Sequence, residues 1–428
     1  MSIVIALIIF SVLVAIHELG HFLLAKKNGI TVIEFSIGMG PRLFSFVKGG
    51  TRYSLKLLPI GGSCMMGEDD PENKDENNFN NKNVWARIST IFAGPFFNFV
   101  LAFIFSLILI GNVGYDPAEV TNVPAGSLAE QAGLKVGDII TEIDGKNVVF
   151  ARDIDIYTDF IGVSKEPFEV EYKRDGKTFT TKITPEYMKK YMLGFYYDPT
   201  TSQVSQVTKG SAMYDAGVEA GDTITKVNGT DITKDYTLAD YLDEHPIQEA
   251  TAIALEYEHN GKIKSASLVP RETEMYSIGF GYNHYYEDAG VWGTIKYSFS
   301  TVRYWIEMTV RGLGSIFSGD VGMDDLGGPV RIVDELGSVM EAKDEIGTKY
   351  VILNLLQWAI LLSANLGVMN LLPIPALDGG RLFFLFIEAV RGKPISREKE
   401  GYVHGIGFIL LMLLMVFVFF NDIKNIFF

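Results

Sequence analysis

The sequence predicts a polytopic α-helical membrane protein with four transmembrane helices, membrane-associated β-hairpins and two small α+β domains outside the membrane. Three observations indicate this fold class. Hydrophobic residues make up 48% of the 428 residues, and the mean hydropathy of +0.18 is high for a soluble protein. Four apolar runs are long enough to cross a bilayer. A long polar segment between the second and third runs contains an internal repeat, which indicates folded domains outside the lipid.

Composition excludes several other classes of protein. With 29 Phe, 20 Tyr and 21% charged residues, the chain has too much apolar surface for intrinsic disorder. The single cysteine, Cys64, excludes an intramolecular disulfide framework. A net charge of −15 disfavours nucleic acid as a partner, because binding a polyanion requires a concentrated basic face. We therefore expect no nucleic-acid partner.

The four apolar runs cover residues 1–25, 88–110, 351–372 and 405–420, the last with its flanks. By position, the first run is compatible with a cleavable signal peptide. A retained span fits better, because no Lys or Arg precedes the apolar core and no small-residue cleavage site follows it. Lys26 and Lys27 instead come directly after the run. We therefore expect four retained crossings.

Basic residues flank the spans on one side of the membrane, which the positive-inside rule assigns to the cytoplasm. The connection between the first and second spans carries Lys26, Lys27, Arg42, Lys48, Arg52, Lys56 and Arg87. The connection between the third and fourth spans lies on the same side, because an even number of crossings separates the two connections. It carries Arg381, Arg391, Lys393, Arg397 and Lys399. Residues 112–350 then lie outside. They hold 39 Asp and Glu against 22 Lys and Arg, which accounts for the acidic excess of the chain.

The outer segment contains two copies of one pattern, VTNVPAGSLAEQAGLKVGDIITEIDG from Val120 and VSQVTKGSAMYDAGVEAGDTITKVNG from Val204. Each copy predicts a strand, a turn, a short helix, a second strand and an Asp-Gly or Asn-Gly hairpin turn. This pattern resembles the circularly permuted PDZ domains of bacterial membrane and periplasmic proteases. It implies two extracytoplasmic PDZ-like α+β domains, at residues 112–200 and 201–289. Such domains bind extended peptides by strand addition, although either copy can instead be a spacer that excludes bulky proteins.

The rest of the chain forms three further parts. Residues 1–111 hold the first two spans and the predicted hairpins, and residues 350–428 hold the last two spans. Residues 290–349 contain aromatic, partly amphipathic stretches. They lie along the membrane surface or pack as ordinary helices, and the sequence leaves both arrangements open.

The first span contains His17, Glu18 and His21 in an HELGH pentad. On a helix, residues four apart project from the same face, so both imidazoles can bind one metal ion. Zinc suits imidazole nitrogens, and Glu18 is placed to act as a general base without binding the metal. Polar and charged groups inside a spanning helix are costly, and a functional cavity is the usual reason for them. We therefore predict Zn²⁺ at this pentad, with Glu18 as the catalytic residue.

A hydrolytic zinc site usually has three protein ligands, so a third must come from elsewhere in the membrane domain. Asp378 is the best candidate. It follows Pro373 and Pro375, which end the third span and expose irregular backbone beside a carboxylate. If the HELGH pentad were absent, an Asp before two glycines would more commonly be a helix-capping residue in a turn. Beside the pentad, and on the same side of the membrane as His21, Asp378 is predicted to complete the metal site.

These residues resemble the site-2 protease family of intramembrane zinc metalloproteases, most closely its bacterial regulator of sigma-E protease type. The family pattern is HExxH in the first span and LDG in the third, matched here from His17 and by residues 377–379. Members with PDZ domains also have a glycine-rich hairpin, an AGPxxN stretch and an Asn-rich approach to LDG. Residues 38–40 and 93–98, with Asn365 and Asn370, match these features. The resemblance runs in order through essentially the whole chain. One departure is the second hairpin, PIGGSCMM, where many members carry an aromatic residue after the glycines.

The resemblance implies a multi-pass protease of the bacterial inner membrane that performs regulated intramembrane proteolysis, with its active site toward the cytoplasm. Its substrates would be single-span membrane proteins, such as anti-sigma factors or remnant signal peptides, already trimmed by a site-1 type protease. A spanning helix hides its carbonyl groups, so a substrate must first unwind. Hairpins within residues 30–58, including Gly38 and Gly40, would pair with the unwound chain. Asn365 and Asn370 would bind released backbone groups, or else form helix–helix hydrogen bonds.

Two other functions remain to be compared with this one. A non-catalytic membrane scaffold would use the PDZ-like pair to bind exported peptides, with a structural or vestigial metal site. Glu18 disfavours that function, because a structural zinc site needs no general base. An ion or solute transporter fits four spans poorly and leaves the repeat unexplained.

Overall fold

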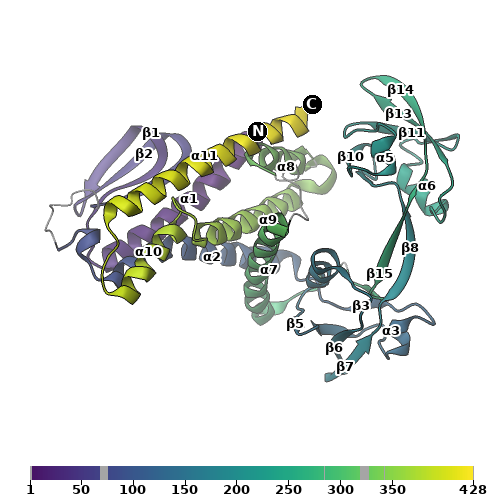
Figure 1. Ribbon diagram of the computed structural model, residues 1–428, viewed down its shortest axis with the longest axis horizontal. Coiled ribbons are helices and arrows are strands. Elements are labelled where there is room, and N and C mark those ends of the chain that lie inside the picture. The colour runs from purple at the N-terminus through teal and green to yellow at the C-terminus, as the bar shows by residue number, and fades with distance from the viewer. Residues whose placement is uncertain (1, 68–75, 284, 319–326, 342, 428) are drawn as a thin grey trace. The chain divides into compact units, whose positions relative to one another are not determined.

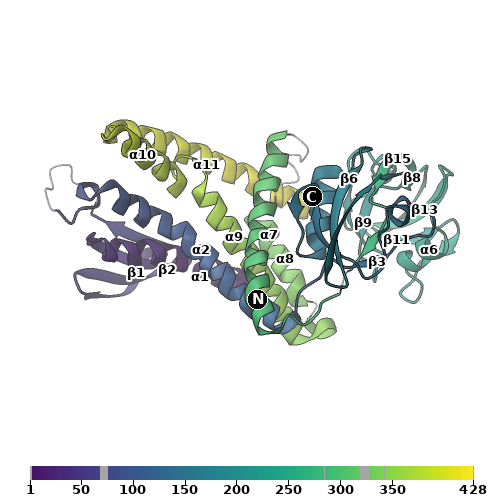
Figure 2. The ribbon, with the colours of Figure 1, turned by 90° about the horizontal axis from the view of Figure 1, so that it is seen from below.

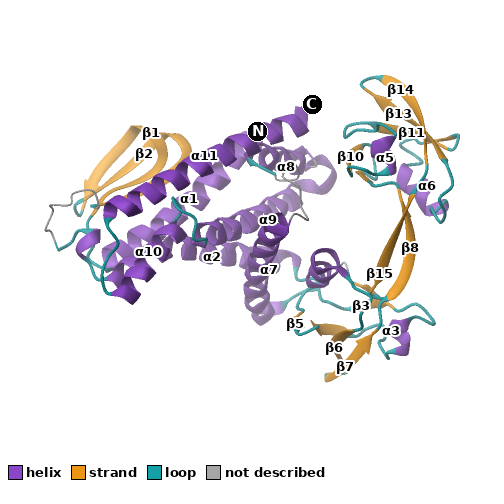
Figure 3. Ribbon diagram, in the orientation of Figure 1, coloured by secondary structure: helices purple, strands orange, loops and turns teal. Residues whose placement is uncertain are grey.

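The computed structural model describes residues 2–67, 76–283, 285–318, 327–341 and 343–427. The chain divides into two compact units. A helical unit comprises Met1–Pro117 with His284–Phe428, and a β-rich unit comprises Ala118–Asn283. Figure 3 shows that strands occur in the β-rich unit and in one hairpin beside the helices of the other unit.

The helical unit combines long helices with one β-hairpin (Figure 1). Its helices are, in chain order, α1 (Ser2–Lys27), α2 (Val84–Val113), α7 (Gly290–Ser318), α8 (Pro329–Glu341), α9 (Lys343–Leu371), α10 (Asp378–Arg391) and α11 (Arg397–Phe427). The hairpin joins β1 (Val32–Lys48) to β2 (Thr51–Met66), and a short 3-10 turn, η1 (Phe79–Asn81), precedes α2.

Four helices in the described part of the chain are long and apolar enough to cross a membrane. The candidate spans are Ile3–Lys27, Val84–Val113, Gly347–Leu371 and Glu398–Lys424. The third begins at a kink in α9, where Gly347 has a φ of +81°. The apolar runs predicted from the sequence are therefore confirmed as four helices of spanning length, the form in which such runs satisfy every backbone hydrogen bond in a bilayer.

The remaining helices of this unit pack against the spans. Helix α7 crosses α2 and α9 steeply (Figure 2), with the rings of Phe103 and Phe299 4.2 Å apart. Helix α8 packs against α1 and α9. Its N-terminal N–H groups, including those of Gly328 and Val330, donate to the buried carboxylate of Asp422 on α11. The sequence left two arrangements open for residues 290–349, along the membrane surface or packed as ordinary helices. Both α7 and α8 pack against neighbouring helices.

The outer strand of the hairpin lies beside α1. Residues 32–37 of β1 lie between two segments of β2, because Phe35 pairs with Tyr53 on one side and with Cys64 on the other. Residues 62–66 therefore form an outer strand. The bend in β1 requires glycine at position 38, where φ is +85° and a Cβ would come within 2.5 Å of the Leu58 carbonyl oxygen.

The β-rich unit contains two copies of the same arrangement. The elements of the first are β3 (Val120–Asn122), α3 (Leu128–Gln131), β4 (Ile139–Ile143), β5 (Lys146–Asn147), α4 (Ala151–Asp155), η2 (Ile156–Gly162), β6 (Phe168–Arg174) and β7 (Lys177–Ile183). Those of the second are β10 (Val204–Val207), α5 (Ala212–Asp215), β11 (Thr223–Val227), β12 (Thr230–Asp231), α6 (Leu238–Glu244), β13 (Ile253–His259) and β14 (Lys262–Leu268). The sheets have matching orders, β5-β4-β6-β7 and β12-β11-β13-β14.

The second copy is inserted into the first, which is completed only by residues that follow the second. Strands β8 (Glu186–Met192) and β15 (Arg271–Ser277) form an antiparallel ribbon that leads into the second copy and back. Beyond the ribbon, β16 (Gly281–Tyr282) pairs with β3, whereas β9 (Phe195–Tyr197) pairs with β10. Ile278 and Phe280 thus join the hydrophobic core of the first copy. This packing differs from the predicted ranges 112–200 and 201–289, because the first copy takes its last strand from the far side of the second.

Candidate metal centre

Two histidines of α1 face α2. His17 and His21 lie one helical turn apart, both are buried, and their Nε2 atoms are 3.1 Å from each other. A Cβ at Gly20 would come within 2.3 Å of the Ala93 carbonyl oxygen. Glycine at this position therefore allows α1 and α2 to approach closely enough for the imidazoles to contact α2.

Each imidazole is bonded to α2 through its other ring nitrogen. His21 Nδ1 lies 2.9 Å from the Thr90 carbonyl oxygen, which only accepts, so this nitrogen carries the proton. His17 Nδ1 lies 3.0 Å from the side-chain amide of Asn98. The amide atom nearest the ring is Nδ2, and Asn98 Oδ1 has no hydrogen-bond partner among the described residues. Exchanging the two by rotation of the amide lets the oxygen accept from His17 Nδ1–H. Both Nε2 lone pairs then point into the same space.

Asp378, the first residue of α10, closes the site. Its Oδ2 lies 3.0 Å from His17 Nε2 and 3.2 Å from His21 Nε2. Gly379 leaves room for the preceding loop, because a Cβ there would come within 2.0 Å of the Leu372 carbonyl oxygen. Burial alone would raise the pKa of Asp378, but in the metal-free site hydrogen bonds and charge from the two imidazoles, when their Nε2 atoms carry protons, hold it below its ordinary value. The carboxylate is therefore ionised, as a metal ligand must be.

The loop before Asp378 is held from α11. Ala376 has a φ of +77°, a conformation that is costly for a residue with a side chain. Its N–H donates a hydrogen bond of 2.8 Å to His404 Nδ1 on α11. The position of Asp378 thus depends on a contact between the loop and the last spanning helix.

The three side chains fit a zinc ion. Two imidazole nitrogens and one carboxylate oxygen form a triangle with edges of 3.0, 3.1 and 3.2 Å. Ligand atoms on a zinc tetrahedron with bonds of about 2.0–2.1 Å are about 3.3–3.4 Å apart, close to these edges. With both Nδ1 atoms protonated, three lone pairs converge on one point, and only a cation there makes that arrangement favourable. His17, His21 and Asp378 are also a cluster able to hold a metal within the described residues.

A cavity of about 370 Å³, here called the metal-centre cavity, opens beside this triangle. Glu18 lines it together with the three candidate ligands. The opposite wall is the outer strand of the hairpin, residues 62–66. A Cβ at Gly62 would lie 3.1 Å from Glu18 Cγ, so the strand passes directly over the carboxylate side chain. A carboxylate, a metal site and the outer strand of the hairpin therefore share one space.

Gly94 of α2 borders the same site. A Cβ at this position would come within 2.3 Å of His21 Nε2 and 2.9 Å of His17 Cε1. The space next to the coordinating nitrogens therefore exists because residue 94 has no side chain.

Comparison with known proteins decides the family. A family model described as "Peptidase family M50" matches residues 5–414. The chain belongs to peptidase family M50. It is 34% identical to the zinc metalloprotease RasP of Geobacillus kaustophilus, over 100% of this chain and 98% of the relative. It is 32% identical to the regulator of sigma-W protease RasP of Bacillus subtilis, over 98% of both chains.

A third relative gives the same result. The chain is 31% identical to the regulator of sigma-E protease RseP of Escherichia coli, over 98% of this chain and 97% of the relative. As a member of family M50, the protein is a zinc metalloprotease. The predicted family, enzyme class and metal are thereby confirmed.

The M50 fold brings together four residues that the sequence singled out, His17, Glu18, His21 and Asp378. It places the other predicted site residues elsewhere. Gly38 and Gly40 lie at the bend of β1, and Asn365 Oδ1 accepts a hydrogen bond from Thr309 on α7. Asn370 is half-buried near the end of α9. Among the described residues that line the metal-centre cavity, none of these four is present.

Sequence reasoning matched Gly94 and Asn98 to a motif of the family but assigned neither of them, nor Thr90, to the metal site. Thr90, Gly94 and Asn98 are spaced four residues apart, so they share one face of the helix, and that face meets the histidines. The signal was present in the sequence as small and polar residues repeated every four positions within an apolar span. Sequence reasoning noted residues 59–66 as a hairpin that departs from the family pattern but did not place residues 62–66 beside the metal site, because only the pairing of β1 shows which strand is the outer one.

Proposed function

We propose that this M50 peptidase is an intramembrane endopeptidase in which His17, His21 and Asp378 bind zinc and Glu18 is the general base. The observation that carries the proposal is the triangle of lone pairs beside the Glu18 carboxylate in one cavity. Bound zinc would polarise the scissile carbonyl and make a water molecule more acidic. A non-catalytic scaffold would give Glu18 no role at this position.

Glu18 supplies the proton transfers of the reaction. Its carboxylate takes a proton from the attacking water, whose oxygen bonds to the scissile carbonyl carbon. The carbon–nitrogen bond then breaks, and Glu18 returns the proton to the leaving nitrogen. Residues 62–66 hold the substrate, since an unwound segment of chain can pair with this strand edge over Glu18. We assign backbone pairing to this strand rather than to Gly38 and Gly40.

The substrates that we propose are single-span membrane proteins. Relatives named as regulators of sigma-W and sigma-E support anti-sigma factors as one class, and remnant signal peptides are another. The test follows a panel of tagged single-span proteins in cells that produce either the unchanged chain or its Asp378→Asn variant. Accumulation of a panel member only with the variant identifies a substrate. If no member differs between the two strains, the proposed substrate class is wrong.

Asp378→Asn is expected to weaken zinc binding by at least about 100-fold, because the amide has no charge to offset that of the ion. The measurement is zinc per chain after dialysis against a graded chelator. Asp235→Asn, at an exposed position of the β-rich unit, is the matched control and should retain zinc. Equal retention of zinc in both variants would remove Asp378 from the ligand set.

We also propose that the β-rich unit lies outside the cytoplasm. The metal centre lies toward the cytoplasmic end of α1 and opens to the cytoplasm. The support is the basic residues that flank the spans. Two exposed lysines allow a matched test in a Cys64→Ser background. A thiol at Lys177 should react with an impermeant reagent in intact cells, whereas a thiol at Lys393 should not. The opposite labelling pattern would invert the topology.

We propose that the β-rich unit restricts access by substrates that still carry a large outer domain, so that cleavage follows a first trimming step. A deletion can test this because Tyr115 and Glu287 exchange backbone hydrogen bonds of 2.8 and 2.9 Å and hold the two chain ends together. Replacing residues 118–283 by a short Gly-Ser linker should leave the zinc site intact and allow cleavage of untrimmed substrates. If the zinc-loaded deletion variant discriminates as strongly as the full chain, the unit has another role.

A further inference from the structure

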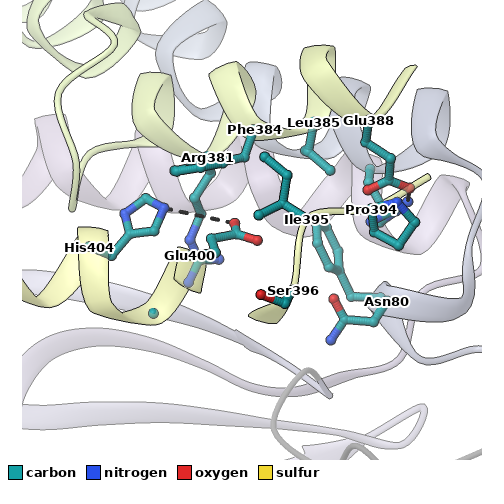
Figure 4. Close-up of a pocket in the computed structure, with 13 residues that line it drawn as sticks. Asn80, Arg381, Phe384, Leu385, Glu388, Pro394, Ile395, Ser396, Glu400 and His404 are labelled. Atoms are coloured by element: carbon teal, nitrogen blue, oxygen red, sulfur yellow. Dashed lines mark hydrogen bonds and ion pairs between the residues drawn. The ribbon is translucent and has the colours of Figure 1, made fainter. Parts of the chain in front are cut away.

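A second cavity, of about 670 Å³, lies where α10, the start of α11 and the start of α2 meet (Figure 4). We call it the α10–α11 cavity. Arg381 lines both this cavity and the metal-centre cavity. The two cavities therefore border on the same side chain.

One face of α10 connects the two cavities. Asp378, Arg381, Leu385 and Glu388 follow one another at intervals of three or four residues, so they lie along one face of the helix. The first is a candidate zinc ligand and the last three line the α10–α11 cavity. Ten residues of helix span about 15 Å, which an extended chain covers with about four or five residues.

The cavity contains a hydrogen-bond donor without an acceptor. His404 Nδ1 accepts from the Ala376 N–H, so this nitrogen is unprotonated and the ring carries its proton on Nε2. His404 Nε2 is buried and has no hydrogen-bond partner among the described residues. The nearest carboxylate oxygen, Glu400 Oε1, is 3.8 Å away, too far for a hydrogen bond. Figure 4 shows the imidazole turned toward Glu400, which lies one turn earlier on α11.

The lining suits a polypeptide better than a phosphate group. Arg87 forms an ion pair with Glu388, and Arg381 faces a space that also contains Glu400, so the formal charges of the described lining residues cancel. An anionic phospholipid headgroup would require a net positive site. Apolar side chains such as Phe384 line the same space, so peptide carbonyl groups and side chains both find partners there.

We propose that the α10–α11 cavity binds the unwound substrate about four or five residues from the scissile bond, where His404 Nε2–H donates to a substrate backbone carbonyl. This inference rests on the proposed protease function. It assigns to α10 a second role besides supplying Asp378. One face of this helix would contact the substrate chain between the metal centre and the α10–α11 cavity.

The test uses the full-length zinc-loaded protein and two single-span substrates that share one scissile bond. One substrate ends one residue after that bond on the cytoplasmic side, and the other continues for about eight residues, beyond the reach of the cavity. We expect the extension to lower KM by about tenfold in the unchanged protein, the effect of one or two added contacts. Ser396→Trp, which fills the cavity from an exposed loop position, should abolish this advantage. Zinc content and kcat for the short substrate should not change, and Ser396→Ala is the matched control.

A second variant separates the two nitrogens of His404. In His404→Asn, the amide oxygen can accept from Ala376 in place of Nδ1, but no donor replaces Nε2. This variant should also lose the KM advantage while keeping its zinc. A photoreactive residue at position 395 in the Glu18→Gln protein should cross-link to the extension of the long substrate.

The outcomes distinguish this inference from the proposed function. If the unchanged protein cleaves neither substrate, the protease assignment for these substrates fails. If it cleaves both with the same KM, or if Ser396→Trp raises KM equally for both, the cavity is not a substrate subsite. Cross-linking to phospholipid alone would assign the cavity to a lipid and overturn the proposal.

Discussion

Replacing Glu18 by glutamine is expected to remove cleavage while leaving zinc in place. The amide has the size and shape of the carboxylate but cannot take a proton from water, and loss of a general base typically lowers kcat by about 10²–10⁴-fold. Zinc should remain because Glu18 is not part of the triangle of His17, His21 and Asp378. The measurements are kcat on a single-span substrate and zinc per chain, made on the same preparation.

The matched control for this substitution is Glu398→Gln. Glu398 is exposed in the first turn of α11, outside the metal-centre cavity, so this variant should cleave at the normal rate. A Glu18→Gln protein that keeps full activity would show that another group is the base. Loss of zinc together with activity would instead indicate that Glu18 supports the metal rather than the proton transfer.

A single methyl group at position 94 is expected to empty the metal site. The Cβ of a Gly94→Ala variant would come within 2.3 Å of His21 Nε2 and 2.9 Å of His17 Cε1, distances at which a methyl group and these ring atoms overlap. The backbone of a packed span cannot easily withdraw, so we expect the rings to rotate away from Asp378. Zinc affinity should fall by at least about 100-fold and cleavage with it.

Gly111→Ala is the control, because it introduces the same methyl group into the same helix. There the nearest atom, Thr294 Cγ2, would lie at 3.8 Å, an ordinary van der Waals contact. This variant should keep both zinc and activity. If Gly94→Ala also binds zinc normally, α1 and α2 are farther apart in the active protein than in this structure.

Much of the fold follows from local patterns. The four spans are runs of apolar residues, and a bilayer permits such runs only as helices. The two repeats contain the Asp-Gly and Asn-Gly pairs that the structure places in tight turns, where Asp144 and Asn228 both have positive φ. The discontinuity of the first repeat was not predictable in this way, because Phe280, which immediately precedes β16, completes a core formed by residues much earlier in the chain.

The sequence by itself determined the four apolar runs of spanning length, the internal repeat and the pairing of two histidines with a glutamate. Each of these is a pattern of residues along the chain and needs no contact between distant segments. The sequence also nominated Asp378, through prolines that interrupt a span and through resemblance to a family. Only the tertiary structure decided which groups surround the histidines. Thr90, Gly94 and Asn98 act through close approach of α1 to α2, and residues 62–66 become an edge only when β1 is paired on both sides. Such contacts arise from packing between distant segments, which local periodicity does not encode.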